Sequence, residues 1–295
     1  MVKVFFLRLV VFVLRRLPQR SGAALVRWLG RTVYRFSPWA EATRDNMWHV
    51  LGTQADPTQV AQLARKAFEN RALNYYDMVR LSGAPLEKAS EQAAIEGLEP
   101  ILQLLEQKRG AVVVSAHIGP MEHMIQAMSA FGCPLIGIAE HMQSEPLHQY
   151  IMGLRTAHGL DLISTKGSLL DVLRRVKKGE VLASAIDRDS TETGRILEFF
   201  GGPAWLPDGY ARVAVSVNVP LVFAYCRRTG DGTVARVFPP IYPDRSLGKQ
   251  QAVADVLARA VGQLEETIRE DPAEWHLSTP VWRLAQERLE QGRLA

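Results

Sequence analysis

The chain has 295 residues, of which 47% are hydrophobic and 22% are charged, as in an ordinary globular protein. This length suits one large α/β domain or two small ones, and the two cysteines, Cys133 and Cys226, lie beside apolar runs without metal-ligand spacing. The net charge of +4 is uneven: residues 1–40 carry eight basic and no acidic side chains, whereas the remainder has a net charge of −4. The basic segment is rich in Phe, Val, Leu and Trp, which favours a membrane surface over nucleic acid.

The apolar run at residues 4–14 is shorter than the roughly 20 residues of a spanning helix. No small-residue cleavage site follows it, which argues against a signal peptide. After Pro18, a second amphipathic helix is expected, with arginines every four residues at Arg27, Arg31 and Arg35. Two such helices suit the interface of an anionic leaflet. A helix pair packed on its own domain, or a shallow spanning helix, are the alternatives.

We therefore divide the chain into a basic, membrane-associating helical segment at residues 1–40 and a larger domain at residues 41–295. The larger part alternates between helical periodicity and short apolar, β-branched runs. Helices are expected at residues 57–81, 100–107, 120–131, 146–157, 169–178 and 252–269, and strands at 111–117, 134–139, 160–164, 180–186 and 220–226. This alternation predicts an α/β fold, with a mostly parallel central sheet flanked by helices on both faces.

The strand predicted at residues 111–117 ends on His117, and a glycine and a proline then turn the chain into a helix that carries Glu122. Loops at strand ends commonly carry the chemistry of α/β proteins. A neutral imidazole can take a proton from a hydroxyl, and a carboxylate behind it can fix its tautomer. We predict that His117 is a general base oriented by Glu122. For this motif alone, an unpaired strand-end histidine is the alternative.

Several other chemistries lack their motifs. The absence of a Gly-x-Ser-x-Gly elbow disfavours a serine hydrolase of the α/β type. The absence of Gly-x-Gly-x-x-Gly and of a Walker loop argues against dinucleotide and P-loop nucleotide binding. His117, Glu122 and His123 match neither His-Glu-x-x-His nor its inverse, so no metal site is expected.

The run from His117 to Glu122 resembles the histidine–four residues–acid motif of glycerolipid acyltransferases. Most closely it resembles the bacterial lipid A biosynthesis (lauroyl/myristoyl) acyltransferase family, in which Asn-Trp usually stands where this chain has Pro120 and Met121. Further blocks follow in the family's order at residues 145–155, 173–180, 186–189, 199–204, 220–228 and 271–275. The resemblance covers about residues 111–282, and the basic apolar N-terminus also suits the family.

The resemblance implies transfer of a fatty acyl chain to a hydroxyl of a membrane glycolipid or lysolipid. The donor would be an acyl carrier protein or coenzyme A thioester, which acts as co-substrate without a further cofactor. The enzyme would lie at the cytoplasmic face of the bacterial inner membrane, peripherally or anchored by its N-terminal segment. An acyltransferase for another acceptor (a lysophospholipid, a mannosylated inositol lipid or an amine) and a non-catalytic lipid-binding protein with the same fold are the alternatives.

Within these blocks, the resemblance makes Arg155 a candidate for binding a phosphate or headgroup. Asp187 and Asp189 would brace this arginine or bind acceptor hydroxyls, unless they only cap their loop. Backbone N–H groups near Gly119, or a side chain of a later block, are candidates for stabilising the oxyanion. The candidate substrate-binding residues are thus Gly119, Arg155, Asp187, Arg188, Asp189, Phe200 and Gly201. Phe199 and Phe200 are more typical of core, Arg227 and Arg228 of solvated strand-end charges, and His276 of a structural residue.

Overall fold

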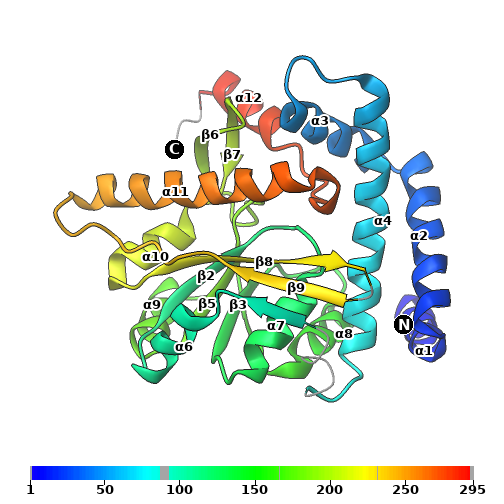
Figure 1. The fold of residues 1–295 in the computed structure, drawn as a ribbon, viewed down its shortest axis with the longest axis horizontal. Helices are drawn as coiled ribbons and strands as arrows, with labels where there is room; N and C mark the ends of the chain where they lie inside the picture. The colour runs from blue at the N-terminus through cyan, green and yellow to red at the C-terminus, as the bar shows by residue number, and fades with distance from the viewer. Residues whose placement is uncertain (1, 87–92, 166, 231, 293–295) are drawn as a thin grey trace.

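The computed structural model describes residues 2–86, 93–165, 167–230 and 232–292 (Figure 1). The elements, in chain order, are α1 (Val2–Arg16), α2 (Gln19–Phe36), α3 (Trp39–Leu51), α4 (Pro57–Leu81), β1 (Ala93–Glu96), α6 (Glu99–Glu106), β2 (Ala111–Ser115), α7 (Met121–Ala130), β3 (Leu135–Ala139), α8 (Glu145–Arg155), η1 (Thr156–His158), β4 (Asp161–Ser164), α9 (Leu169–Lys177), β5 (Val181–Ala185), β6 (Arg195–Phe199), β7 (Gly202–Leu206), α10 (Gly209–Val217), β8 (Leu221–Thr229), β9 (Gly232–Val237), α11 (Lys249–Glu270), η2 (Pro272–Glu274) and α12 (Val281–Glu290).

The predicted α/β fold with a mostly parallel sheet is confirmed. Seven strands form the main sheet in the order β1-β9-β8-β2-β5-β3-β4. Strands β8, β2, β5, β3 and β4 are parallel, whereas β9 runs antiparallel to β8 and pairs in parallel with β1. A separate antiparallel hairpin, β6-β7, stands beyond the sheet (Figure 1). The carboxyl ends of the five parallel strands therefore share one edge, where open α/β sheets place their ligands.

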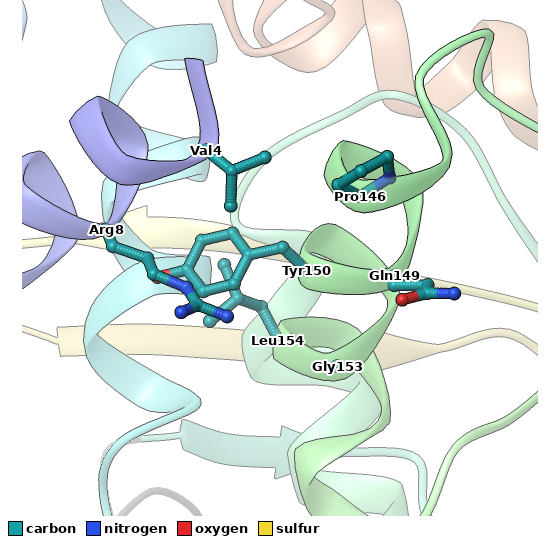
Figure 2. A pocket seen from close by; sticks show the side chains of 7 residues that line it. All are labelled: Val4, Arg8, Pro146, Gln149, Tyr150, Gly153 and Leu154. Carbon is teal, nitrogen blue, oxygen red and sulfur yellow. The ribbon is translucent and has the colours of Figure 1, made fainter. Parts of the chain in front are cut away.

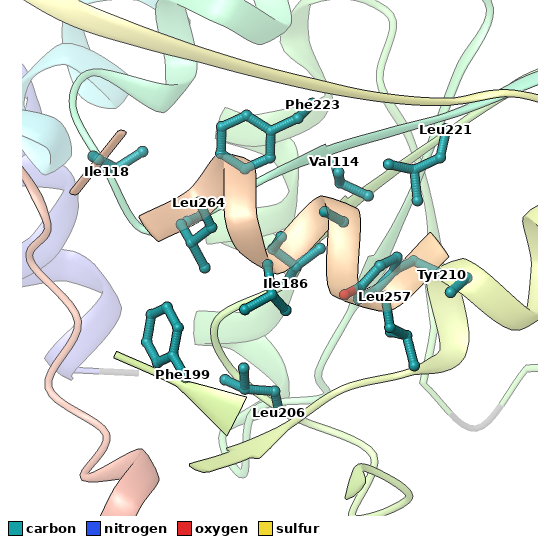
Figure 3. Close-up of a cluster of buried hydrophobic side chains, with 14 of the residues drawn as sticks. Val114, Ile118, Ile186, Phe199, Leu206, Tyr210, Leu221, Phe223, Leu257 and Leu264 are labelled. Carbon is teal, nitrogen blue, oxygen red and sulfur yellow. The ribbon is translucent and has the colours of Figure 1, made fainter. Parts of the chain in front are cut away.

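Strand β2 packs on both faces, which explains its unbroken apolar sequence. Val112 and Val114 point into the larger core, which α9, α10 and α11 cover (Figure 3). Ala111 and Val113 point to the opposite face, where α6 and α7 supply the covering side chains. The pleat thus buries every residue of this strand except the last, and fixes the level at which the chain leaves the sheet.

The N-terminal helices pack beside the sheet rather than on it. Helix α4 stands upright at the side of the sheet, with α2 along its outer side (Figure 1). The two helices approach closely at Gly22 and Gly30, where a Cβ would lie 2.0 Å from the Tyr76 hydroxyl and 2.7 Å from the Phe68 carbonyl oxygen. In the described part of the chain, no helix is both long and apolar enough to cross a membrane.

The structure adds elements that the periodicity did not predict: α3, α10, α12 and the strands β1, β6, β7 and β9. These strands are either antiparallel or at the sheet edge, so they lack the continuous apolar run of a buried parallel strand. Strand β2 also ends at Ser115, two residues before the predicted end at His117. His117 therefore lies in the loop, where its side chain is free to reach a neighbouring strand end.

Candidate active site

His117 forms a bonded pair with Asp187. Its Nδ1 lies 2.9 Å from Asp187 Oδ1, and its backbone N–H donates to Asp187 Oδ2 at 2.8 Å. Because an ionised carboxylate only accepts, Nδ1 carries the proton and the lone pair lies on Nε2. The His117 side chain is 31% exposed, and no described residue bonds its Nε2. The imidazole therefore presents an accessible basic nitrogen with its tautomer fixed from behind.

The register of the sheet brings these two residues together. Strands β2 and β5 are parallel neighbours in which Ser115 pairs with Ala185. His117 and Asp187 each follow their strand by two residues, so they leave the shared edge at the same level. The hydrogen bond from the Ile186 N–H to the Ser115 carbonyl, at 2.9 Å, continues the pairing one step past the strand ends.

Asp187 is fully buried and held from two sides. Trp275, also fully buried, donates its indole N–H to Asp187 Oδ2 at 2.9 Å. Burial by itself raises the pKa of Asp187, but the positive charge and hydrogen bonds of His117, together with the Trp275 bond, bring that pKa below its ordinary value. Asp187 is therefore an ionised, immobile acceptor behind His117.

The sequence-based prediction made Glu122 the residue that orients His117, but in the structure Asp187 occupies this position. Among the described residues, no hydrogen bond or ion pair joins Glu122 to His117. Glu122 is buried in the first turn of α7, where burial raises its pKa to about 7, with Arg155 lowering it and Asp77 raising it. Asp187, by contrast, leaves the neighbouring strand at the level of His117 and bonds both its Nδ1 and its backbone N–H.

The loop after His117 is held by the end of η2 and the segment that follows it. The backbone N–H of Gly119 donates to the Glu274 carbonyl at 3.0 Å, and that of His276 donates to the His117 carbonyl at 2.9 Å. Gly119 has a φ of +57°, and a Cβ there would lie 1.8 Å from the Cys226 carbonyl oxygen. Only glycine fits this close approach. The Gly119 N–H is already bonded to the Glu274 carbonyl, so among the candidate oxyanion donors near this residue, Gly119 itself has no free N–H.

His276 is buried beside the pair and contacts the same loop. Its Nε2 lies 3.3 Å from the Gly119 carbonyl oxygen, and its ring is 6.4 Å from the His117 ring. Burial, with a further contribution from His117, lowers the pKa of His276 to about 3. It is thus a neutral residue that holds the loop, in keeping with its expected structural role.

A buried charge cluster, Asp77–Arg228–Glu274, ties the long helix α4 to the site. Arg228 forms ion pairs with Asp77 and, at 3.4 Å, with Glu274, and all three side chains are mostly buried. The same helix supplies Asn74, whose Oδ1 accepts from the Met121 N–H at 3.1 Å. The expectation that Arg228 is a solvated charge is wrong: it is exposed only to 18% and lies between two carboxylates.

The other predicted substrate-binding residues occupy different surroundings. Arg155 ends α8, is exposed, and has no described carboxylate within ion-pair distance, although its charge acts on Glu122. Arg188 pairs with Glu140 at 2.8 Å on the surface. Asp189 caps its own loop, accepting from the N–H groups of Thr191 and Gly194 at 2.9 and 2.8 Å and from the Trp205 indole at 3.0 Å. For Asp189, the loop-capping alternative describes the contacts.

Phe200 and Gly201 form the turn between β6 and β7, both with positive φ. The turn is fixed by the bond from the Phe200 N–H to Glu265 Oε1 at 2.6 Å. The neighbouring Phe199 is fully buried, and its ring packs edge-on against Trp275 with centroids 5.9 Å apart. This block therefore supports the site through the indole that bonds Asp187.

The chemistry of the site is that of a base without a nucleophile of its own. In the described part of the chain, no group of three or more His, Cys, Asp or Glu side chains could hold a metal ion. His117 and Asp187 together can accept a proton from a substrate hydroxyl and stabilise the resulting imidazolium. The sequence singled out His117, which lies two residues past the end of β2. Trp275 stood in the family block at residues 271–275 without a role assigned to it, and Asn74 stood in no motif.

Comparison with known proteins identifies the family of the chain. Residues 1–284 match the model of the bacterial lipid A biosynthesis acyltransferase family. The chain is 26% identical over 248 residues to a phosphatidylinositol mannoside acyltransferase of Mycolicibacterium smegmatis, covering 82% of this chain and 79% of that protein. It is 28% identical over 256 residues to the protein of the same name from Mycobacterium tuberculosis, covering 82% and 77%. The resemblance inferred from the motifs is thus confirmed, and the chain belongs to the bacterial lipid A biosynthesis acyltransferase family.

Proposed function

We propose that this acyltransferase moves a fatty acyl chain from a thioester to a hydroxyl of a membrane glycolipid, with His117 as the general base. The observation that carries the proposal is the His117–Asp187 pair, in which a buried carboxylate occupies Nδ1 and leaves Nε2 accessible. The family supplies the reaction class. The pair supplies a group that this reaction needs from the protein, a base beside the attacking hydroxyl.

In the proposed reaction, Nε2 of His117 takes the proton of the acceptor hydroxyl as its oxygen attacks the thioester carbonyl. The tetrahedral intermediate then collapses, the carbon–sulfur bond breaks, and the imidazolium returns the proton to the departing thiolate. An ester and a free thiol result, and His117 is neutral again. Asp187 stabilises the imidazolium in between, because it is ionised and fixed on Nδ1.

We assign Arg155 to an anionic group of the donor or acceptor, because it is exposed and has no described ion-pair partner. Glu122 then acts on Arg155 rather than on His117 Nδ1. With a pKa of about 7, it holds a proton for much of the time near neutral pH and can donate as well as accept a hydrogen bond. This keeps Glu122 in the site, in a role different from the one first predicted.

For the acceptor, we favour a mannosylated inositol lipid over a lipid A precursor. Both relatives described above carry the name phosphatidylinositol mannoside acyltransferase, and the similarity covers most of each chain. This acceptor was one alternative in the sequence analysis, beside the lysophospholipid and amine. Mass spectrometry of lipids from cells with and without the protein tests it: loss of an acylated mannosyl inositol lipid supports the assignment, and loss of an acylated disaccharide lipid contradicts it.

We place the protein peripherally on the cytoplasmic face of the membrane, with residues 1–40 as the contact and an acyl carrier protein or coenzyme A thioester as donor. Large apolar side chains on α1 and α2 are exposed, among them Phe5 at 68% and Trp28 at 57%. An amphipathic helix of this kind binds in the interfacial plane. Deletion of residues 1–35 should abolish sedimentation with anionic vesicles, and a deletion variant that still sediments contradicts the placement.

His117→Ala separates the enzyme from a lipid-binding protein with the same fold. With thioester and lipid extract, the variant should lose ester formation by roughly 10²–10⁴-fold, which is what a positioned base contributes. His49→Ala is the matched control, since His49 lies on α3 and stacks on Trp282 at 4.3 Å. Unchanged turnover in His117→Ala contradicts the mechanism.

A further inference from the structure

A groove lies between the N-terminal helix α1 and helix α8, with a cavity volume of about 430 Å³. Val4 and Arg8 come from α1, and Pro146, Gln149, Tyr150, Gly153 and Leu154 come from α8 (Figure 2). This volume falls in the range of small-molecule sites. None of these residues belongs to the His117 site, although Arg155 directly follows the groove on the same helix.

The groove joins an apolar wall to one unneutralised cation. Val4, Tyr150 and Leu154 supply the apolar surface, and the Arg8 guanidinium lies 5.6 Å from the centre of the Tyr150 ring. Among the described residues, no carboxylate lies within ion-pair distance of Arg8. Gln149 adds an amide at the same rim, and its side chain also bonds Glu145 at 2.8 Å.

Two other arginines of the N-terminal helices are already used by the fold. Arg15 donates to the Val79 carbonyl at 2.8 Å and to the Ser82 hydroxyl at 2.9 Å. Arg31 lies 3.3 Å from Glu69. Arg8 thus differs from these two in having its charge available, at the mouth of an apolar groove.

The surface around the groove indicates where a ligand would come from. On α1, the exposed side chains Phe5, Phe6, Leu9 and Phe12 stand on the outer face of the same helix that carries Arg8. Placed at a membrane, these side chains enter the acyl region, and Arg8 then lies near the phosphate level. A free phosphate ion would leave the apolar wall unused, and a neutral lipid would leave the Arg8 charge unused.

We propose that this groove binds one anionic phospholipid of the supporting bilayer, with its phosphate at Arg8 and the start of one acyl chain along Tyr150 and Leu154. The site rests on the membrane placement proposed above. Leu154 also packs in a small cluster with Val11, Met78 and Val79, which joins α1, α8 and α4. A lipid in the groove therefore holds α1 against the helix that ends in Arg155.

The test uses the full chain and dihexanoyl phosphatidylglycerol below its micelle concentration, so that binding reports a single-molecule site and not a bilayer. Titration calorimetry should give one site per chain. Gly153→Leu fills the groove without strain, because a Cβ at Gly153 meets nothing within 4 Å on this helix. It should weaken binding at least tenfold. Gly262→Leu is the matched control, since Gly262 is also a helical glycine with open surroundings, on α11.

Arg8→Gln should also weaken phosphatidylglycerol binding by about tenfold, and dihexanoyl phosphatidylcholine should bind as weakly to the unmodified chain. Equal binding by Gly153→Leu and Gly262→Leu overturns the site. Displacement of the lipid by inorganic phosphate or by coenzyme A at equal concentration overturns its proposed occupant.

Failure of this proposal is separable from failure of the membrane placement. Sedimentation with vesicles of phosphatidylcholine and phosphatidylglycerol tests the placement, through the deletion of residues 1–35. If the full chain sediments with these vesicles but binds no monomeric lipid, the groove is wrong and the placement stands. If it binds monomeric lipid at one site but does not sediment, the placement is wrong.

Discussion

The carboxyl edge of the sheet and the N-terminal helices are built in opposite ways. At the sheet edge, the two oxygens of Asp187 accept three hydrogen bonds. The Gly119 N–H and the His117 carbonyl are bonded to Glu274 at the end of η2 and to His276 just after it. On α1 and the outer face of α2, by contrast, large side chains such as Phe5 and Trp28 lie mostly in water. At the sheet edge, these polar groups bond one another within the protein, whereas the N-terminal helices leave apolar surface uncovered.

The first region is suited to holding a fixed geometry, and the second is suited to attachment to a partner. A buried network whose groups are all bonded holds one arrangement, as a base of fixed tautomer and position requires. The exposed apolar side chains of α1 and α2 hold no such arrangement, but covering them with apolar material lowers the free energy of the system. The predictions below test whether the first region is rigid for catalysis and whether the second is open for binding.

The largest effect is expected from Asp187→Asn. An amide in this place can donate a hydrogen bond to His117 and thereby favour the wrong tautomer, so kcat should fall by about 10²–10⁴-fold. Asp189→Asn is the matched control: Asp189 also accepts backbone N–H groups and also has a pKa below its ordinary value, but it only caps its loop. Steady-state kinetics should show a loss in Asp187→Asn only. Equal losses would mean that the loop, and not the pair, limits the reaction.

How much of the fold and of the site could be predicted from the sequence depends on how far apart in the chain the interacting residues lie. The α/β fold and the place of His117 just after a central strand follow from local periodicity, because a buried parallel strand is apolar throughout. The partner of His117 depends on the strand order, since β5 lies beside β2 although β3 and β4 come between them in the chain. Sequence proximity therefore favoured Glu122, and spatial register selects Asp187.

The residues that support the His117–Asp187 pair were still harder to predict from the sequence. Trp275 arrives from a short segment after α11, and its position follows from packing against Phe199 and from the bridge between Ile118 and Trp275. No periodicity marks such a segment. Similarly, Asp77 looks like an ordinary helix residue until the fold places it against Arg228.

The next effect concerns the pH dependence of stability, through Glu122. Its pKa is raised by burial from 4.5 to about 7, so the native state retains a proton that the unfolded state releases above pH 4.5. Stability contributed by this group is thus complete below pH 4.5 and lost as the pH rises towards 7. Glu122→Gln should remove this loss. The free energy of unfolding of the variant, relative to that of the unmodified chain, should therefore rise by up to about 3 kcal/mol between pH 4.5 and 8.

Urea unfolding at both pH values measures this gain. The exposed Glu266→Gln on α11 is the control, for which the difference should not change with pH. A Glu122→Gln variant whose relative stability stays constant with pH would show that the carboxyl is solvated or paired, contrary to its buried place in α7.

A smaller effect on the rate is expected from Trp275→Phe. The ring remains to fill the core, but Asp187 Oδ2 loses one of its donors, and a hydrogen bond to a charged group is worth about 1.5–3 kcal/mol. We expect kcat to fall at least tenfold with KM for the acceptor unchanged. Trp282→Phe is the control, because its indole also makes a buried bond, to the Phe199 carbonyl at 3.1 Å, without reaching Asp187. Similar kcat values in the two variants would limit Trp275 to a packing role.

The smallest effect is expected at the N-terminal surface, where one side chain is a fraction of a large apolar area. Phe5→Ser should weaken partition onto vesicles containing phosphatidylglycerol by about fivefold, since partial insertion of a phenyl ring contributes about 1 kcal/mol, roughly half of full burial. Phe131→Ser provides the comparison, because Phe131 is 45% exposed but lies at the end of α7, towards the opposite edge of the sheet from His117. Vesicle sedimentation should separate the two. If both variants bind as the unmodified chain does, the exposed face of α1 does not meet the bilayer, and the contrast between a closed site and an open surface has to be explained by another partner.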